Sequence, residues 1–196
     1  MLSNNMASLK GSETEKNLLK AFAGESQARN RYTYFASVAK KQGYEQISAI
    51  FLETAENEKE HAKVFFKHLE GGDTEIIATY PAGKIGTTEE NLLAAAEGEE
   101  MEWTQIYQKF EKIAKEEGFN EVANSFKFIA KVEEKHEKRY RKLLDNVKKG
   151  HVFKKAHSVK WICRNCGFVH EGEHAPDMCP ACKHPQAYYQ IFEENY

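Results

Sequence analysis

The sequence predicts an all-α four-helix bundle with one long crossover, followed by a small C-terminal metal-binding domain. Two observations predict the bundle: four long stretches repeat apolar residues at the 3.6-residue period of a helix, and glycines separate these stretches. A third observation predicts the small domain, because all four cysteines lie between Cys163 and Cys182, where the helical period has stopped. We therefore expect a bundle over residues 11–150 and a metal-binding domain over residues 151–196.

Capping patterns and glycines predict the limits of the first two helices. The first begins at a Ser-x-x-Glu capping box at residues 12–15 and ends near Gly43. The second follows from about Glu45 and runs to the Gly71-Gly72 pair. Since only a tight turn at Gly43 joins them, the two helices are predicted to form an antiparallel hairpin.

The third and fourth helices are predicted in the same way. The third begins at a Thr-x-x-Glu capping box at residues 87–90 and ends at Gly118, and the fourth runs from about Asn120 to Gly150. Between the two hairpins lies a longer stretch, residues 73–86, which can span the length of a helix of ~26 residues, or ~39 Å. One long crossover between two hairpins is the topology of ferritin-like bundles.

The two hairpins repeat in sequence. From the glycine of the turn to the glutamate of a Glu-x-x-His pair the spacing is 15 in both halves, at Glu58 and at Glu133. From the preceding glutamate to the glycine it is 18 in the first half, starting at Glu25, and 19 in the second, starting at Glu99. The extra residue predicts a π-bulge between Glu99 and Gly118, a feature common at functional sites.

Seven ionisable side chains lie on the apolar stripes of the four helices, where burial is expected. They are Glu25, Glu58, His61, Glu99, Glu102, Glu133 and His136. A single glutamate on a helix usually faces solvent, and we expect this of six glutamates that lie off the stripes: Glu53, Glu56, Glu60, Glu70, Glu97 and Glu100. A lone histidine on a stripe, such as His68, is expected to be a packing or surface residue. Five stripe glutamates on four helices are different, because burying so much like charge is costly unless cations neutralise it. The pattern predicts a dinuclear metal site in the bundle core.

The cysteines form two C-x-x-C pairs, Cys163 with Cys166 and Cys179 with Cys182, separated by twelve residues. This spacing predicts one metal held by four thiolates. Zinc and a single iron fit four thiolates equally well by geometry, and the spacing alone favours structural zinc. Clustered cysteines suit a metal site better than a disulfide framework, and a reducing, cytoplasmic setting is the expectation.

The bulk composition excludes several classes of partner. The net charge is −2, which indicates neither a nucleic acid nor an anionic membrane. No apolar run approaches the ~20 residues that span a bilayer, and residues 1–10 do not have the apolar core of a secretory signal.

Several segments closely resemble the rubrerythrin family. They are KNLLKAFAGESQARNR (residues 16–31), GEEMEW (98–103), VEEKH (132–136) and CRNCGFVHEG (163–172), and the resemblance covers nearly the whole chain after residue 10. It implies a non-haem di-iron centre in the bundle and a mononuclear rubredoxin-type iron on the four cysteines. Two departures, Lys183 where rubredoxins usually have glycine and a shorter loop between the cysteine pairs, concern the redox potential of the tail and not its ligation.

The resemblance also implies a role for each site residue. Glu58 and Glu133 would bridge the two irons, Glu25 would be terminal on one iron, and Glu99 and His136 would be terminal on the other. Glu102 and His61 would alternate on the first iron, Glu102 when it is oxidised and His61 when it is reduced. Tyr32 and Tyr107 would hydrogen-bond to ligand carboxylates. Glu102 aligns with Ala28 in the repeat, so it is the carboxylate that a symmetric, static site does not need.

The activity that the resemblance implies is peroxide reduction in oxidative-stress defence. The substrate would be hydrogen peroxide, and electrons would pass through the tail iron from an external rubredoxin or NAD(P)H-dependent reductase, giving an NADH-linked peroxidase. We expect a head-to-tail homodimer or a higher homo-oligomer that brings the tail of one chain beside the di-iron site of another. The alternatives are a ferroxidase or iron-storage protein, a dioxygen-reducing oxidase, and a zinc ribbon on a helical scaffold that binds a partner.

Overall fold

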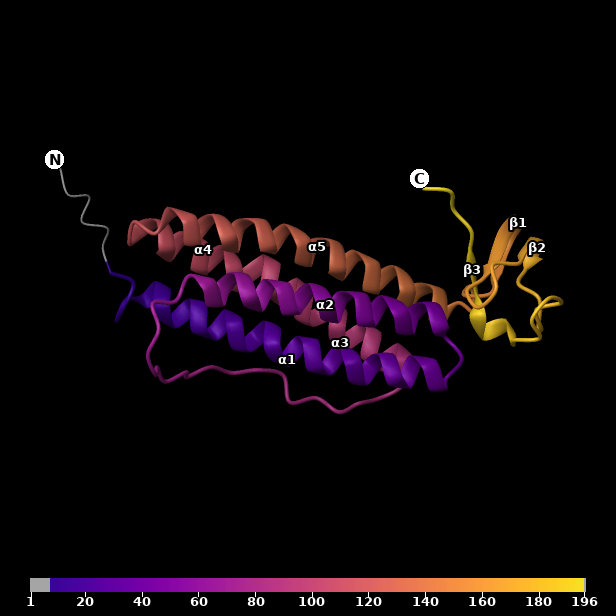
Figure 1. Ribbon diagram of the computed structural model, residues 1–196, viewed down its shortest axis with the longest axis horizontal. Coiled ribbons are helices and arrows are strands. Elements are labelled where there is room, and N and C mark those ends of the chain that lie inside the picture. Colours follow the sequence, from indigo (N-terminus) through magenta and orange to yellow (C-terminus); the bar gives the residue numbers. More distant parts are fainter. Residues whose placement is uncertain (1–7, 196) are drawn as a thin grey trace.

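The fold is a long helical bundle with a small sheet domain at one end (Figure 1). A computed structural model describes residues 8–195. Helices α1 (Glu13–Lys41) and α2 (Glu45–Lys67) form one antiparallel hairpin. In the second hairpin, α5 (Asn120–Lys148) packs along a broken helix. The pieces of that broken helix are α3 (Thr88–Met101), η1 (Glu102–Ile106) and α4 (Tyr107–Glu116). The crossover returns along the outside of α1, as predicted for a ferritin-like bundle (Figure 1).

The helix ends differ in two details from the prediction. At α1, the Ser12 side chain accepts from the N–H of Glu15 as expected, but the Glu15 carboxylate accepts from the N–H of Gly11 rather than from that of Ser12. Helix α2 ends at Lys67, before the glycine pair, because the N–H groups of His68 and Leu69 bond to carbonyls three residues back. This tightening of the final turn ends the α-helical pattern early. The capping box at Thr87 is complete.

The predicted π-bulge is confirmed. Residues Glu102–Ile106 form a π-helical turn between α3 and α4. It absorbs the one residue by which the second half of the repeat exceeds the first, and it begins at Glu102. The extra residue therefore changes the direction in which Glu102 leaves the helix relative to a regular α-helix.

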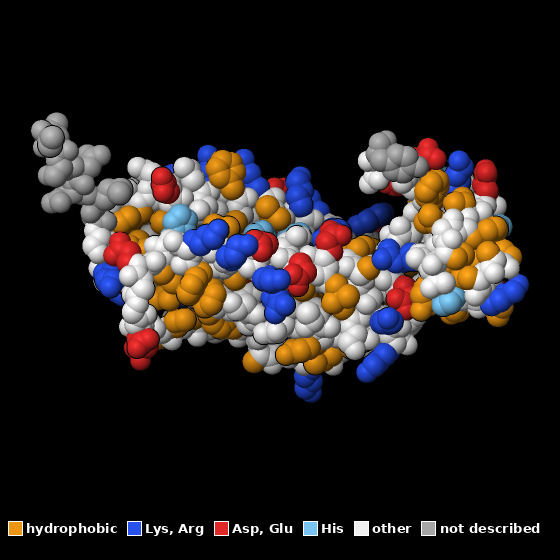
Figure 2. Space-filling model, viewed as in Figure 1, with side chains coloured by type: hydrophobic (Ala, Val, Ile, Leu, Met, Phe, Trp, Pro, Cys, Tyr) orange, Lys and Arg blue, Asp and Glu red, His pale blue; other side chains and the backbone are white. Residues whose placement is uncertain are grey.

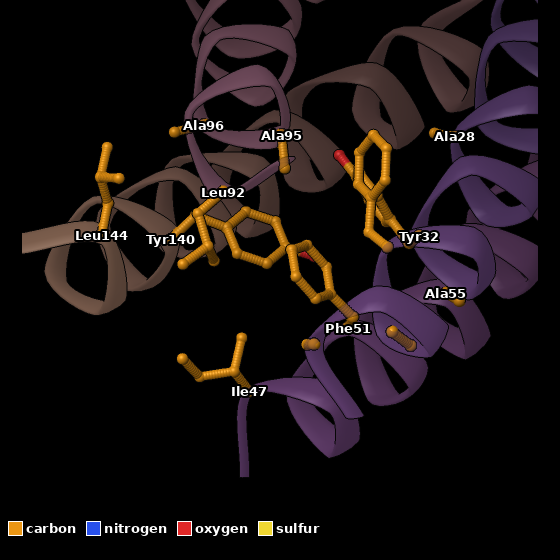
Figure 3. Close-up of a cluster of buried hydrophobic side chains, with 13 residues drawn as sticks. Ala28, Tyr32, Ile47, Phe51, Ala55, Leu92, Ala95, Ala96, Tyr140 and Leu144 are labelled. Carbon is orange, nitrogen blue, oxygen red and sulfur yellow. The ribbon is translucent and has the colours of Figure 1, made fainter. Parts of the chain in front are cut away.

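Two apolar clusters fill the bundle, one on each side of its centre. The first is built on aromatic rings, including Tyr32, Phe51 and Tyr140, whose side chains converge from three helices (Figure 3). The rings of Phe51 and Tyr140 lie 5.1 Å apart between centroids. The second cluster includes Phe65 and Phe126, stacked at 5.0 Å. Each helix passes from one cluster to the other, so its central polar residues lie between two water-excluding layers.

The C-terminal domain is a three-stranded antiparallel sheet in the order β2-β1-β3. The strands are β1 (Lys154–Cys163), β2 (Val169–His174) and β3 (Tyr189–Ile191), with a short helix η2 (Gln186–Tyr188) before β3. Trp161 and Tyr189 are fully buried, and the Trp161 indole donates to the carbonyl of Gly172 over 2.9 Å. The domain contacts the α1–α2 turn, where the ring of Phe153 stacks on that of Tyr44 with a centroid separation of 6.1 Å.

Lys183 carries backbone strain next to a cysteine. Its φ is +61°, in the left-handed region that favours glycine. Lys183→Gly is therefore expected to stabilise the C-terminal domain by about 0.5–1 kcal/mol, because relief of the strain exceeds the entropy that glycine adds to the unfolded chain. The measurement is thermal unfolding of this domain in the metal-loaded protein, with Ala181→Gly, between Cys179 and Cys182, as the control. If Lys183→Gly destabilised the domain as much as Ala181→Gly, the strain would be absent.

Within the described residues, no helix is long and apolar enough to cross a membrane.

Candidate metal centres

Two groups of buried side chains meet at the centre of the bundle. One consists of Glu25, Glu58, His61 and Glu133, and the other of Glu58, Glu99, Glu133 and His136. Within each group the potential ligand atoms lie within 4.8 Å of one another. Six of the seven predicted ligands are thus brought together. The six glutamates predicted to face solvent, Glu53, Glu56, Glu60, Glu70, Glu97 and Glu100, are all exposed.

Glu58 and Glu133 belong to both groups, and each turns one oxygen to each histidine. The Nδ1 atom of His61 lies 2.8 Å from Oε2 of Glu58 and 2.9 Å from Oε1 of Glu133. The Nδ1 atom of His136 lies 3.2 Å from Oε1 of Glu58 and 2.8 Å from Oε2 of Glu133. Two carboxylates that each face two sites are arranged as bridges between a pair of cations.

The donor set fits such cations. Five buried carboxylate oxygens of the site make no well-aligned hydrogen bond among the described residues, although three of them lie within 3.2 Å of a histidine Nδ1. They are Oε2 of Glu25, Oε1 of Glu58, Oε2 of Glu99 and both oxygens of Glu133. Unpaired buried oxygens are rare in folded proteins because each costs free energy. Bound iron would satisfy them, and carboxylate and imidazole ligands suit iron.

Two buried tyrosines donate hydrogen bonds to carboxylates of the site, as expected. The hydroxyl of Tyr32 donates to Oε1 of Glu99 over 2.5 Å, and that of Tyr107 donates to Oε1 of Glu25. Burial, reinforced by the neighbouring carboxylate, raises the pKa of each phenol well above its usual value. Both hydroxyls therefore stay protonated and act as fixed donors to the ligand set.

Metal loading of the bundle is expected to release at least two protons per chain at pH 7. Burial opposes protonation of His61 and His136, but the adjacent carboxylates of Glu133 and Glu58 raise their pKa values to about 10 and about 12. Burial, followed by the charge of Glu58, raises the pKa of Glu99 to about 8. In the metal-free protein these three groups are protonated at pH 7, and a metal needs them deprotonated, so metal affinity should rise with pH.

The measurement is a titration with ferrous iron in weakly buffered, oxygen-free solution containing a pH indicator, using protein whose cysteine site is already loaded. Repeating it at pH 6 and pH 8 should show tighter binding at pH 8. Release of fewer than two protons per chain would contradict the proposed protonation state.

Glu102 is the predicted ligand that stands apart. It belongs to neither ligand group, while its predicted alternate, His61, does. Glu102 is half-buried at the start of the π-turn, and it lines a cavity beside the metal centre. Burial and the charge of Glu99 raise its pKa well above the usual value. His61 therefore lies within a ligand group, whereas the carboxylate of Glu102 lies outside both groups.

Two further polar residues near the site were not predicted. The Oδ1 atom of Asn57 lies 3.2 Å from Nε2 of His136, so it orients the ring whose Nδ1 faces the carboxylates. The guanidinium of Arg31 lies 6.0 Å from the centre of the Tyr32 ring, and its charge opposes the rise in the pKa of Glu102. No sequence signal identifies either residue, because each acts across helices.

The four cysteines converge as their spacing predicts. Their sulfur atoms lie within 4.8 Å of one another, with Cys163 and Cys182 3.7 Å apart and Cys166 and Cys179 3.6 Å apart. The backbone N–H of His184 lowers the pKa of Cys182 to about 6, which favours the thiolate that binds metal. Cys163 and Cys179 are buried, whereas Cys166 is exposed, so one edge of the site is open to another molecule.

Comparison with known proteins agrees with both centres. The family model described as Rubrerythrin matches residues 16–144, and the one described as Rubrerythrin, rubredoxin-like domain matches residues 161–190. Rubrerythrin of Porphyromonas gingivalis is 61% identical over 96% of this chain and 94% of its own. Rubrerythrin of Nitratidesulfovibrio vulgaris is 57% identical over 97% of this chain and 100% of its own.

Among solved structures, fully reduced nigerythrin (all ferrous) matches with a TM-score of 0.63 and 30% identity, over 98% of this chain and 92% of that one. Fold and sites together define a ferritin-like protein with a di-iron carboxylate–histidine site and a rubredoxin-like four-cysteine site. The chain belongs to the rubrerythrin family.

Proposed function

We propose that this protein is a peroxidase that reduces hydrogen peroxide to water in the cytoplasm, as part of oxidative-stress defence. The observation that carries the proposal is the pairing, in one chain, of a duplicated carboxylate–histidine site with a four-cysteine site. The second site gives the first a source of electrons, which a storage protein would not need. The proposal divides the chain into a catalytic bundle over residues 11–150 and an electron-transfer domain over residues 151–196.

The chain's residues would have the following roles. Glu58 and Glu133 would be shared by two irons, Glu25 would hold one of them, and Glu99 and His136 would hold the other. Tyr32 and Tyr107 hold Glu99 and Glu25 in position by hydrogen bonds. His61 and Glu102 are alternative ligands of one ion, which agrees with His61 lying in the ligand group and Glu102 outside it.

When bound, the ferrous pair supplies two electrons, one from each ion, so that the O–O bond is cleaved to water without release of a hydroxyl radical. The protein keeps bulk water out of the site by means of the apolar clusters on either side. The tyrosine hydroxyls hold the carboxylates rigid, so that little reorganisation accompanies the change in charge.

Electrons would reach the bundle from the rubredoxin-like iron of a second chain. A chain's own C-terminal domain contacts Tyr44 at the end of the bundle. Glu58 lies 14 residues further along α2, about 21 Å at the rise of an α-helix. This separation supports a head-to-tail homodimer, in which the domain of one chain lies beside the di-iron site of its partner. An external rubredoxin or NAD(P)H-dependent reductase would then reduce the four-cysteine iron.

The test is stopped-flow mixing of the ferrous protein with hydrogen peroxide and, separately, with dioxygen. We expect oxidation by peroxide to be much faster at equal concentrations. Faster oxidation by dioxygen would indicate an oxidase or ferroxidase instead.

A further inference from the structure

A large cavity lies beside the metal centre, beneath the crossover. Its volume is about 1070 Å³, and it is bounded by α1, by the helix formed of α3, η1 and α4, and by the crossover segment 77–85. The crossover runs along α1 as a strap (Figure 1). Tyr80 fastens the strap, because its hydroxyl donates to the carbonyl of Lys20 over 2.6 Å. Its ring also packs closely on α1, because a Cβ added to Gly24 would lie only 3.5 Å from Cε1 of Tyr80.

The cavity reaches the metal centre through three side chains already assigned to it. Tyr32, Glu102 and Tyr107 all line the cavity. Much of the remaining wall is apolar, and includes Ala28, Phe35, Ile106 and Phe110. Along α1 the wall extends from Lys20 to Phe35, about 22 Å of helix. Hydrogen peroxide is too small to need a long apolar cavity. The volume of this cavity is typical of a binding site for a much larger organic ligand.

The rim of the cavity carries positive charge. Lys84 on the strap and Lys109 on α4 both line it and are exposed. With Lys20 and Arg31 they outnumber the acidic residues of the lining, Glu97 and Glu102. Arg31 lies inside, with its guanidinium 5.9 Å from the centre of the Phe35 ring. In the space-filling view, hydrophobic side chains gather along the lower edge of the bundle, where Figure 1 shows the crossover (Figure 2). An apolar interior with a basic rim fits a chain-like molecule with an anionic end.

We propose that the cavity binds alkyl hydroperoxides that carry a carboxylate, and that the protein reduces them. The alkyl chain of the ligand would lie beneath the strap, with the hydroperoxide group toward Glu102. This inference rests on the proposed function and extends its substrate class. The reaction is ROOH + 2e⁻ + 2H⁺ → ROH + H₂O. The O–O bond breaks, the ferrous pair supplies both electrons, solvent supplies both protons, and the distal oxygen leaves as water. A second copy of the chain is the rival occupant, and the tests below separate it from a small ligand.

The first test measures binding without turnover. Dodecanoate, an unreactive carboxylate with an alkyl chain, is titrated calorimetrically into the oxidised, metal-loaded protein. Ala94 lines the cavity at an exposed position, so Ala94→Trp would narrow it, and Asn124→Trp at an exposed position of α5 is the control. We expect Ala94→Trp to weaken binding at least about tenfold and the control to leave it unchanged. The double variant Lys84→Glu/Lys109→Glu should bind dodecanoate more weakly but bind 1-dodecanol as before. Both substitutions are at exposed positions, so neither changes the interior of the fold.

The second test separates this inference from the proposed function. In Ala94→Trp, kcat/KM for a carboxylated alkyl hydroperoxide should fall at least about tenfold, while that for hydrogen peroxide should stay within about twofold. Hydrogen peroxide turnover without dodecanoate binding would overturn the inference and leave the function standing. Dodecanoate binding that depends on Ala94, in a protein with no hydrogen peroxide turnover, would overturn the function but support the binding site. Loss of a dimer in Ala94→Trp, with no dodecanoate binding, would assign the cavity to a second copy and overturn the inference.

Discussion

Replacing Cys163 and Cys166 together with serine is expected to reduce steady-state peroxide reduction about a hundredfold or more. The ferrous bundle site should still react once with peroxide, because none of its ligands is changed. Further turnovers should stop, because serine cannot replace the thiolates that hold the four-cysteine iron. The measurement compares a single turnover of chemically reduced protein with steady-state turnover driven by a reductase.

The control is Arg164→Ser, which changes an exposed residue between the same two cysteines and should retain both activities. Normal steady-state turnover in the double variant would show that electrons reach the bundle by another route. Loss of the single turnover as well would show instead that the substitutions had damaged the bundle.

Glu102→Ala is expected to leave two metal ions in the bundle and yet reduce peroxide turnover about a hundredfold. The ions should stay because the two ligand groups are complete without Glu102. Turnover should fall because His61 would then have no carboxylate to alternate with. Iron analysis combined with steady-state kinetics measures both quantities on one preparation.

Glu100→Ala provides the comparison, since Glu100 is exposed, lies two residues away and pairs with Arg141 at the surface. It should retain iron and activity. If Glu102→Ala instead lost an iron, Glu102 would be a static ligand, and if it kept full activity, ligand alternation would not be required.

The elements of the bundle could be predicted because each depends on local signals. Apolar periodicity gave the four helices, and a one-residue difference between Glu99–Gly118 and Glu25–Gly43 located the π-turn. The four-cysteine site followed from spacing alone. By contrast, the early end of α2 at Lys67 depends on a tightened last turn that no residue type marks.

The parts of the site that could not be predicted depend on contacts between helices. The bond between Asn57 and His136 joins α2 to α5, and nothing in the sequence pairs these residues. The cavity depends on the course of an irregular crossover, fastened at Tyr80. The position of Glu102 outside the ligand groups likewise depends on how the π-turn directs one side chain.

In the proposed mechanism, electrons from the four-cysteine iron reduce the bundle site after it has reacted with peroxide. The most direct measurement is to add hydrogen peroxide, without dioxygen, to the fully reduced protein and to follow the visible absorption of the ferric four-thiolate iron. We predict that this absorption returns in the unmodified protein and stays absent on the same timescale in Glu133→Ala, which lacks a carboxylate shared by both ligand groups. Equal return of the absorption in both proteins would rule out this electron path, because the four-cysteine iron would then react with peroxide on its own.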